Sequence, residues 1–287
     1  MNKENQFIAL CSGWGVHNLQ GHGHVFDVYD RAANLLIDGE LVALIRHPAP
    51  MSAFAFKIDL KKPFSSILKA NERFWLDGSR IQFKQLTISI KPEVWRKDRL
   101  KCAPIPDSSF LLVENYLKDC GLPGLTIILD PGNNLGQNLM GQILKACQDC
   151  CFKLQKAKNI AAWLAAATNL VGLGVGLTPS GDDFLGGYLA GLFAHGYLNE
   201  KNYQAMAPLA KKSSQTTPLG GQFLRYACLG SYSEHIVELI SAMQIGEAQN
   251  ILAHVRKVLT FGSSSGADTL AGLLAMRGIH GNMFRRL

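Results

Sequence analysis

The spacing of apolar residues changes about a third of the way along the chain. From about residue 7 to residue 90, short apolar stretches are separated by turn residues, which is typical of β-strands. After a segment punctuated by Pro104 and Pro106, apolar residues recur mostly at the spacing of helices. We therefore predict an α+β protein. A β-rich N-terminal module would cover residues 1–106, and a mostly helical domain would cover residues 107–287.

Turn residues in the first module indicate how its strands connect. Val25–Tyr29 alternates as a half-buried strand does. Asn34–Ile37 leads into the turn Asp38-Gly39, so residues 38–40 (Asp-Gly-Glu) are expected to form a hairpin connection. Leu41–Ile45 would be the returning strand. Further strands are expected at residues 54–58 and 86–90, with another turn at residues 77–78. An antiparallel sheet or a small barrel would fit this pattern.

The second half is expected to contain eight helices that share apolar residues at helical spacing. They are predicted over residues 110–120, 141–157, 160–170, 182–197, 222–229, 233–243, 246–259 and 267–276.

Charge and composition narrow the classes of partner. The 29 basic and 22 acidic residues are interspersed, so the net charge of +7 favours small anionic ligands or an acidic partner over nucleic acid. Residues 159–181 are nearly uncharged, but glycines and Pro179 interrupt them, so no membrane span is expected. The seven cysteines form no disulfide framework and the first residues show no secretory signal, which together predict a cytoplasmic protein.

The segment Gly172–Asp183 contains the clearest local signal for a binding site. Glycines at every second position allow a close approach of backbone to a ligand. Ser180 is expected to cap a helix whose free N–H groups and dipole could bind an anion. Asp182 and Asp183 would either repel a phosphate or hold a Mg²⁺ that neutralises it. A helix cap with tight packing would explain the same residues without a ligand.

A second segment, Phe261–Asp268, has the same organisation, because small and hydroxyl residues precede an aspartate at a helix start. Two such starts suggest that both helix N-termini converge on one polar pocket. Arg225 stands inside an otherwise apolar helix and needs a partner, which could be Asp182, Asp268 or an anionic substrate. A structural salt bridge is the alternative.

Metal or cofactor signals are weak. His22 and His24 would lie on one face of a strand, as two metal ligands could, but no Cys/His pair of standard zinc spacing completes a site. A loop near the N-terminus would explain them as well. No cofactor is therefore identified, apart from the Mg²⁺ that the aspartate pair could hold.

Three motifs follow one another in the helical half. They read Gly-Leu-Gly-x-Gly-Leu-Thr-Pro-Ser-Gly-Asp-Asp at 172–183, Leu-Arg-Tyr-Ala-x-x-Gly at 224–230 and Gly-x-Ser-Ser-Gly-Ala-Asp-Thr-Leu-x-Gly at 262–272. Their succession resembles the AllH-type family, whose better-understood members are subunits of oxamate carbamoyltransferase. Residues 25–35 and 39–44 are similar to the family's opening, so the resemblance covers nearly the whole chain. Val175 departs from the pattern, because many relatives are expected to have proline there.

The resemblance implies a carbamoyltransferase that works with two other subunits. Such an enzyme moves a carbamoyl group between carbamoyl phosphate and oxamate. In the catabolic direction, oxalurate (N-carbamoyl-2-oxoglycine) and phosphate give oxamate and carbamoyl phosphate, during anaerobic allantoin degradation in purine catabolism. The Ser-Thr-Arg-Thr phosphate loop of aspartate and ornithine carbamoyltransferases is absent from this sequence. There are two alternatives. The chain could be a non-catalytic assembly or regulatory subunit, or it could be part of an enzyme for another small carboxylate or amide.

Carbamoyl transfer passes through a tetrahedral, oxyanionic centre that N–H and hydroxyl donors stabilise. Under this hypothesis Asp182, Asp183 and Asp268 are acid/base groups or Mg²⁺ ligands, and Arg225 clamps a carboxylate or phosphate. The predicted substrate- and anion-binding residues are Gly174, Gly176, Thr178, Ser180, Ser264, Ser265 and Gly266.

Overall fold

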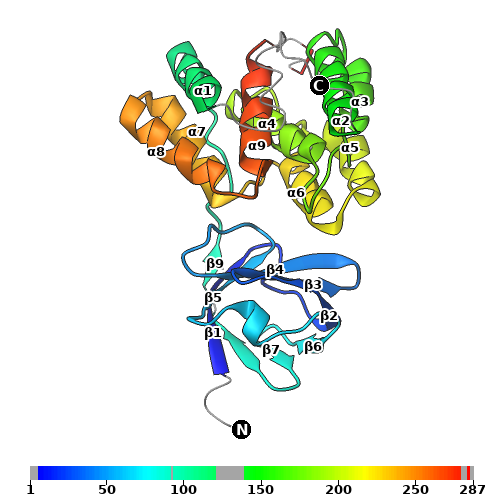
Figure 1. Cartoon of the computed structure of the whole chain (residues 1–287), viewed down its shortest axis with the longest axis vertical. Helices are drawn as coiled ribbons and strands as arrows, with labels where there is room; N and C mark the ends of the chain where they lie inside the picture. The colour runs from blue at the N-terminus through cyan, green and yellow to red at the C-terminus, as the bar shows by residue number, and fades with distance from the viewer. Residues whose placement is uncertain (1–5, 92, 121–138, 279–282, 285–287) are drawn as a thin grey trace. The chain divides into compact units, whose positions relative to one another are not determined.

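Strands and helices occupy separate parts of the chain, as the change in apolar spacing predicts. The computed structural model describes residues 6–91, 93–120, 139–278 and 283–284. Contacts within the chain divide it into two compact units, residues 1–98 and residues 99–287. All strands lie within residues 6–95 and the α-helices of the described part within residues 107–275 (Figure 1). The predicted α+β class is confirmed.

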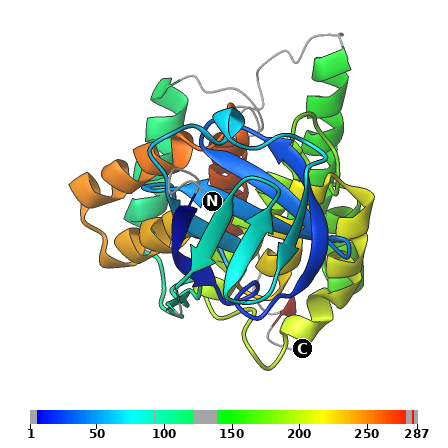
Figure 2. The same ribbon diagram turned by 90° about the horizontal axis from the view of Figure 1, so that it is seen from below.

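Eight strands of the first unit close into a barrel. The hydrogen-bonded order is β5-β4-β3-β2-β6-β7-β8-β1, and an antiparallel β1–β5 pairing joins the two ends. Figure 2 shows these strands, coloured blue to cyan, from a second direction. The bounds are β1 Gln6–Gly13, β2 Gly21–Val28, β3 Ala32–Ile37, β4 Glu40–Arg46, β5 Ala55–Asp59, β6 Arg73–Leu76, β7 Arg80–Phe83 and β8 Thr87–Ile90. A ninth short strand, β9 (Val94–Trp95), pairs in parallel with β1.

Side chains fill the interior of the barrel, as an eight-stranded closure requires. Val25, Leu35, Phe56 and Ile81 are each at most 1% exposed. Most pairings are antiparallel, but β4–β5 and β1–β8 are parallel. The barrel was one of the two arrangements that the strand pattern left open, and the closing pair decides between them.

The predicted hairpin turn at Asp38-Gly39 is confirmed. It connects β3 to β4, with Ile37 paired to Glu40 across a two-residue loop. Asp38 and Gly39 have φ values of 49° and 82°, and two consecutive positive values are what a type I′ turn requires. This turn geometry matches the twist of the flanking strands, so the dipeptide fixes the register of the pair.

Within its described residues, the second unit contains all eight predicted helices, with shifted ends, and one that was missed. Gly246 ends α7 in a left-handed conformation (φ 84°), so the next helix begins at Ala248 and not at the predicted residue 246. The short α5, which carries Pro208 in its first turn, gave no sequence signal. The bounds are α1 Asp107–Cys120, α2 Leu139–Gln155, α3 Ile160–Thr168, α4 Ser180–Ala194, α5 Ala207–Lys212, α6 Pro218–Cys228, α7 Glu234–Ile245, α8 Ala248–Leu259 and α9 Ser265–Ala275.

Helices α4 and α9 pack side by side at the centre of this unit (Figure 1). A Cβ atom added to Gly187 on α4 would lie 1.8 Å from the carbonyl oxygen of Thr269, and one added to Gly272 on α9 would lie 1.9 Å from that of Phe184. The two backbones can approach this closely only because both positions lack side chains. This contact holds the N-terminal ends of both helices together.

None of the helices that the structure describes is long and apolar enough to cross a bilayer. All seven cysteines are free thiols, and Cys147 and Cys151 on α2 are fully buried in the helical core.

Candidate functional site

The two glycine- and serine-rich segments meet inside the helical unit. The Oγ1 atom of Thr178, just before α4, lies 2.7 Å from the Oγ atom of Ser265, the first residue of α9. These residues are 87 positions apart in the sequence. The close packing of α4 against α9 therefore brings together the helix starts that the sequence predicted would converge.

The loop before α4 depends on its glycines. Gly172, Gly174 and Gly176 have φ values of 72°, 131° and 99°, which side-chain-bearing residues rarely adopt. A Cβ atom on Gly174 would also lie 2.5 Å from the amide nitrogen of Ser180. The loop is thus folded tightly against the start of the helix.

The prediction that Ser180 caps α4 is wrong. Ser180 is the first helical residue, Pro179 occupies the capping position, and no side chain caps the helix. The N–H of Gly181 donates to the Leu173 carbonyl at 2.8 Å, and the N–H groups of Asp182 and Asp183 donate to the Pro179 carbonyl at 2.9 and 3.2 Å. The loop carbonyls therefore occupy three N–H groups that we expected to be free for an anion.

Asp182 connects this loop to α6. It is 4% exposed, and its Oδ1 accepts a hydrogen bond from the N–H of Gly172 at 2.9 Å. Its Oδ2 accepts from the hydroxyl of Thr216, next to Thr217, which caps α6. Burial raises the pKa of Asp182, and the two hydrogen bonds partly oppose that shift. Both oxygens thus have partners, and Arg225 is not one of them.

Asp183 has a different environment. Its Oδ2 is buried without a hydrogen-bond partner among the described residues. Burial raises the pKa of Asp183 well above its ordinary value, and hydrogen bonding to the hydroxyls of Ser265 and Thr178 opposes this shift. The charges of Asp268 and Asp182 raise the pKa further. Such a carboxyl group retains its proton at a higher pH than an exposed aspartate does.

The start of α9 supplies the opposite side of this cluster. Ser264 occupies the capping position without a side-chain hydrogen bond to the helix. The N–H of Gly266 donates to the Phe261 carbonyl at 3.1 Å, and a Cβ atom on Gly266 would lie 2.2 Å from the Val258 carbonyl oxygen. Asp268 is fully buried within the first turn.

Arg225 is half-buried on α6. Its Nη2 donates to Oε1 of Gln222 at 2.8 Å, and its guanidinium carbon lies 5.7 Å from the centre of the Tyr226 ring. Arg225 is not among the residues that line the pocket described next.

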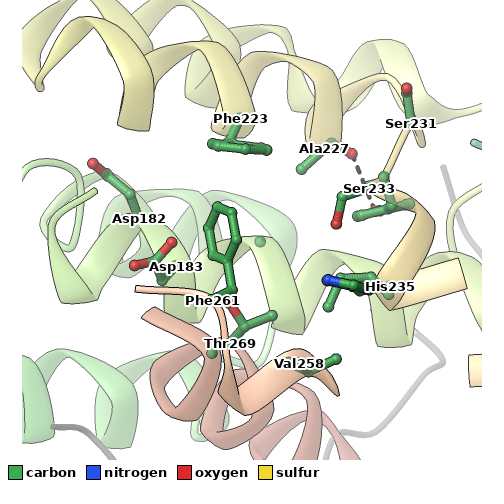
Figure 3. A pocket seen from close by; sticks show the side chains of 14 residues that line it. Asp182, Asp183, Phe223, Ala227, Ser231, Ser233, His235, Val258, Phe261 and Thr269 are labelled. Atoms are coloured by element: carbon green, nitrogen blue, oxygen red, sulfur yellow. Dashed lines mark hydrogen bonds between the residues drawn. The ribbon is translucent and has the colours of Figure 1, made fainter. Parts of the chain in front are cut away.

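A pocket opens beside the two aspartates. Figure 3 shows Asp182 and Asp183 at one end and His235 at the other, with the rings of Phe223 and Phe261 between them. These rings meet edge to face, with centroids 5.8 Å apart at 86°. The remaining lining residues are Gly186, Ala227, Ser231, Tyr232, Ser233, Ile236, Val258, Gly266 and Thr269.

The pocket includes only some of the predicted site residues. Asp182, Asp183 and Gly266 line it, and Thr178 and Ser265 adjoin it through Asp183. Five other predicted residues are not among its lining residues, and neither is the buried Asp268. The five are Gly174, Gly176, Ser180, Arg225 and Ser264.

Sequence reasoning missed the aromatic and histidine wall of the pocket. Neither His235 on α7 nor the rings of Phe223 and Phe261 are among the predicted site residues. Burial lowers the pKa of His235, and the charges of Glu238 and Glu234 partly oppose this shift. The ring is therefore uncharged over a wider pH range than that of an exposed histidine. The only available signal was the position of Phe261 and Phe223 next to two of the motifs.

The described residues do not form a recognisable metal site. Among them, no group of three His, Cys, Asp or Glu side chains is arranged to hold a metal ion. Both oxygens of Asp182 already accept hydrogen bonds. His22 and His24 lie on β2 and are both exposed, and the His22 ring stacks near Trp75 with centroids 6.5 Å apart.

The fold and the pocket define a class of protein: a helical unit in which two glycine- and serine-rich helix starts surround a buried, protonatable carboxyl group. Residues 170–277 match the family model described as oxamate carbamoyltransferase subunit AllH. This match confirms, for this part of the chain, the resemblance that the three motifs predicted. The match contains every residue that lines the pocket. No solved structure matches the chain.

Proposed function

We propose that the chain is a subunit of an oxamate carbamoyltransferase and that its helical pocket takes part in the carbamoyl transfer. The family description supports the first part, and the environment of Asp183 supports the second. We further propose that the enzyme cleaves oxalurate with phosphate in allantoin degradation, in a complex with two other subunits. A cytoplasmic site of action would keep its seven free thiols reduced.

The reaction needs a proton donor at the departing nitrogen. In oxalurate cleavage, a phosphate oxygen forms a bond to the carbamoyl carbon, and the bond from that carbon to the amide nitrogen of oxamate breaks. The nitrogen gains a proton and the phosphate loses one. A carboxyl group whose pKa is raised by burial can donate this proton at neutral pH. We assign that role to Asp183, which would recover its proton from the phosphate hydroxyl.

Hydroxyl groups next to Asp183 could stabilise the tetrahedral centre. The hydroxyls of Thr178 and Ser265 share one hydrogen bond and also hydrogen-bond to Asp183, so one of their two protons could turn from Asp183 to the oxygen of the reacting carbamoyl group. Asp182 is proposed to be a positioning residue, because its two hydrogen bonds join the glycine loop to the start of α6. It would act by holding Asp183 and Thr178 in place.

The second candidate is a non-catalytic assembly or regulatory subunit. One observation favours it: the N–H groups of Gly181, Asp182 and Asp183 at the start of α4 are bonded to carbonyls and are not available to an anion. In that case the chemistry would take place in a partner subunit, and the pocket would be a structural or effector site.

The experiment that tests the proposal is phosphate-dependent cleavage of oxalurate, detected as carbamoyl phosphate. The full chain is assayed alone and co-purified with its partner subunits, and Asp183→Asn is compared with Asp119→Asn, an exposed aspartate on α1. Loss of a general acid is expected to lower kcat about 10²-fold or more, while the control keeps wild-type activity.

Each result has a definite meaning. Activity of the chain alone would require the whole site to lie in this chain, whereas activity only in the complex supports a shared site. If the complex is active and Asp183→Asn is as fast as wild type, the non-catalytic subunit is the better account. If no preparation makes carbamoyl phosphate, the proposed reaction is wrong.

A further inference from the structure

We infer that the pocket binds the uncharged ureide end of the substrate, and that the cations which hold the phosphate come from a partner subunit. This inference rests on the proposed function and deepens it, because it divides the substrates between this chain and another. It follows from the charges, the unpartnered atoms and the walls of the pocket.

The charges that line the pocket are unfavourable for a dianion. Of the described residues in its lining, two are aspartates and one is a histidine, and none is lysine or arginine. Burial raises the pKa of Asp182, and its two hydrogen bonds partly oppose that shift, so in either protonation state it offers no positive charge. A phosphate in this pocket would therefore meet two carboxyl groups and no compensating cation.

An uncharged ureide could supply the hydrogen-bond partner that the buried Oδ2 atom of Asp183 lacks among the described residues. The buried Oδ2 of Asp183 has no hydrogen-bond partner among the described residues, and leaving such an atom unsatisfied is costly. A protonated carboxyl group presents one donor and one acceptor side by side, and a ureide presents a carbonyl and an N–H group in the same arrangement. The two groups can form a pair of hydrogen bonds without burying a net charge.

The walls of the pocket suit a flat, uncharged group. Phe223 and Phe261 present aromatic surface between its two ends (Figure 3). At the far end, burial keeps His235 uncharged over more of the pH range. Ser233 and Thr269 add hydroxyl groups to the lining, which can hydrogen-bond to an amide.

Arg225 is the one basic residue among the predicted site residues, and it does not line the pocket. Its guanidinium bonds to Gln222 and lies over Tyr226 on α6 itself. Carbamoyl phosphate and the carboxylate of oxamate both need guanidinium or ammonium partners. Because the family is described as one subunit of its enzyme, a partner subunit is the natural source of these cations.

The test compares a neutral ureide with inorganic phosphate. Acetylurea and phosphate are titrated separately into the isolated full chain and into the complex, with binding followed by NMR. We expect acetylurea to bind the isolated chain and to perturb resonances of Phe223, Phe261 and Thr269. Phosphate should bind only the complex.

Variants locate the binding. Asp183→Ala should weaken acetylurea binding about tenfold, the equivalent of losing one buried hydrogen bond, whereas the exposed Asp119→Ala should bind as wild type does. If Asp183→Ala fails to fold, Phe261→Leu at the partly exposed rim should also weaken acetylurea binding. Arg225→Gln should leave acetylurea binding unchanged.

Three outcomes would overturn the inference. These are no binding of acetylurea to the isolated chain, binding of phosphate to that chain as tight as that of acetylurea, or loss of phosphate binding to the isolated chain in Arg225→Gln. The oxalurate assay reports on the proposed function separately. If the complex turns over oxalurate but acetylurea does not bind, only the subsite is refuted. If acetylurea binds but no complex makes carbamoyl phosphate, the proposed reaction is refuted.

Discussion

Replacing Gly187 with alanine should destabilise the helical unit, although alanine is the better helix former. The added Cβ would lie 1.8 Å from the Thr269 carbonyl oxygen, whereas ordinary contact begins at 3.4 Å. Helices α4 and α9 would have to separate by about 1.6 Å, because a backbone oxygen cannot rotate away. Overpacking of this kind costs about 3 kcal/mol at the upper end of its usual range. The higher helix propensity of alanine offsets about 1 kcal/mol of this cost. We therefore expect the free energy of unfolding to fall by about 2 kcal/mol.

The neighbouring glycine is a matched control. Gly186 lies on the same turn of α4, and nothing is within 4 Å of the Cβ that alanine would add there. Gly186→Ala should therefore stabilise the chain by about 0.5–1 kcal/mol through propensity alone. For a unit of this size, the loss at Gly187 corresponds to a fall in Tm of roughly 4–8 °C. The assay is thermal and urea unfolding followed by far-UV circular dichroism. Equal stability of the two variants would refute the claim that α4 and α9 pack backbone to backbone.

Three more measurements test the site and its surroundings. Because folding raises the pKa of Asp183, its contribution to stability is greatest below the unfolded pKa of about 3.8 and is lost as pH rises through the folded value. Urea unfolding across pH should show this fall, and Asp183→Asn should flatten it. Thr216→Val should cost about 1–3 kcal/mol, because Oδ2 of Asp182 loses its donor. Equal urea midpoints for Thr216→Val and the wild type would contradict the hydrogen bond from Thr216 to Asp182. Burial raises the pKa of Cys147 to about 12, so iodoacetamide at pH 8 should label exposed Cys102 in the native chain while sparing Cys147. Mass spectrometry of the labelled peptides checks this.

Local signals in the sequence predicted the barrel's turns but not its closure. The Asp38-Gly39 turn follows from two neighbouring residues that accept positive φ values, so the dipeptide alone predicts a hairpin. The closing pair places Ile8 of β1 opposite Asp59 of β5, about fifty residues later. No pattern within either strand specifies that partner, which is why the sequence left a sheet and a barrel equally open.

The candidate site, like the barrel, was predictable from the sequence only in part. The glycines of the loop and the aspartates at the helix start are recognisable in sequence, and the three motifs identified the family. Yet Asp182 and Asp183, neighbours of the same type, differ in environment. One has both oxygens hydrogen-bonded, whereas the other has a buried oxygen without a partner in the described part of the chain. The prediction for Ser180 was wrong because Leu173 and Pro179 supply the carbonyls that its helix start uses.

The sequence by itself determined the α+β class, the eight predicted helices of the second half, the hairpin at Asp38-Gly39 and the resemblance to the AllH family that the match over residues 170–277 confirms. These depend on residue type, on periodicity and on motifs a few residues long. Only the tertiary structure decided that β1 closes the barrel, that α4 and α9 bring Thr178 to Ser265, and that Phe223, Phe261 and His235 wall the pocket. Burial and hydrogen-bond partners come from residues far apart in the chain, and they set which carboxyl group keeps its proton.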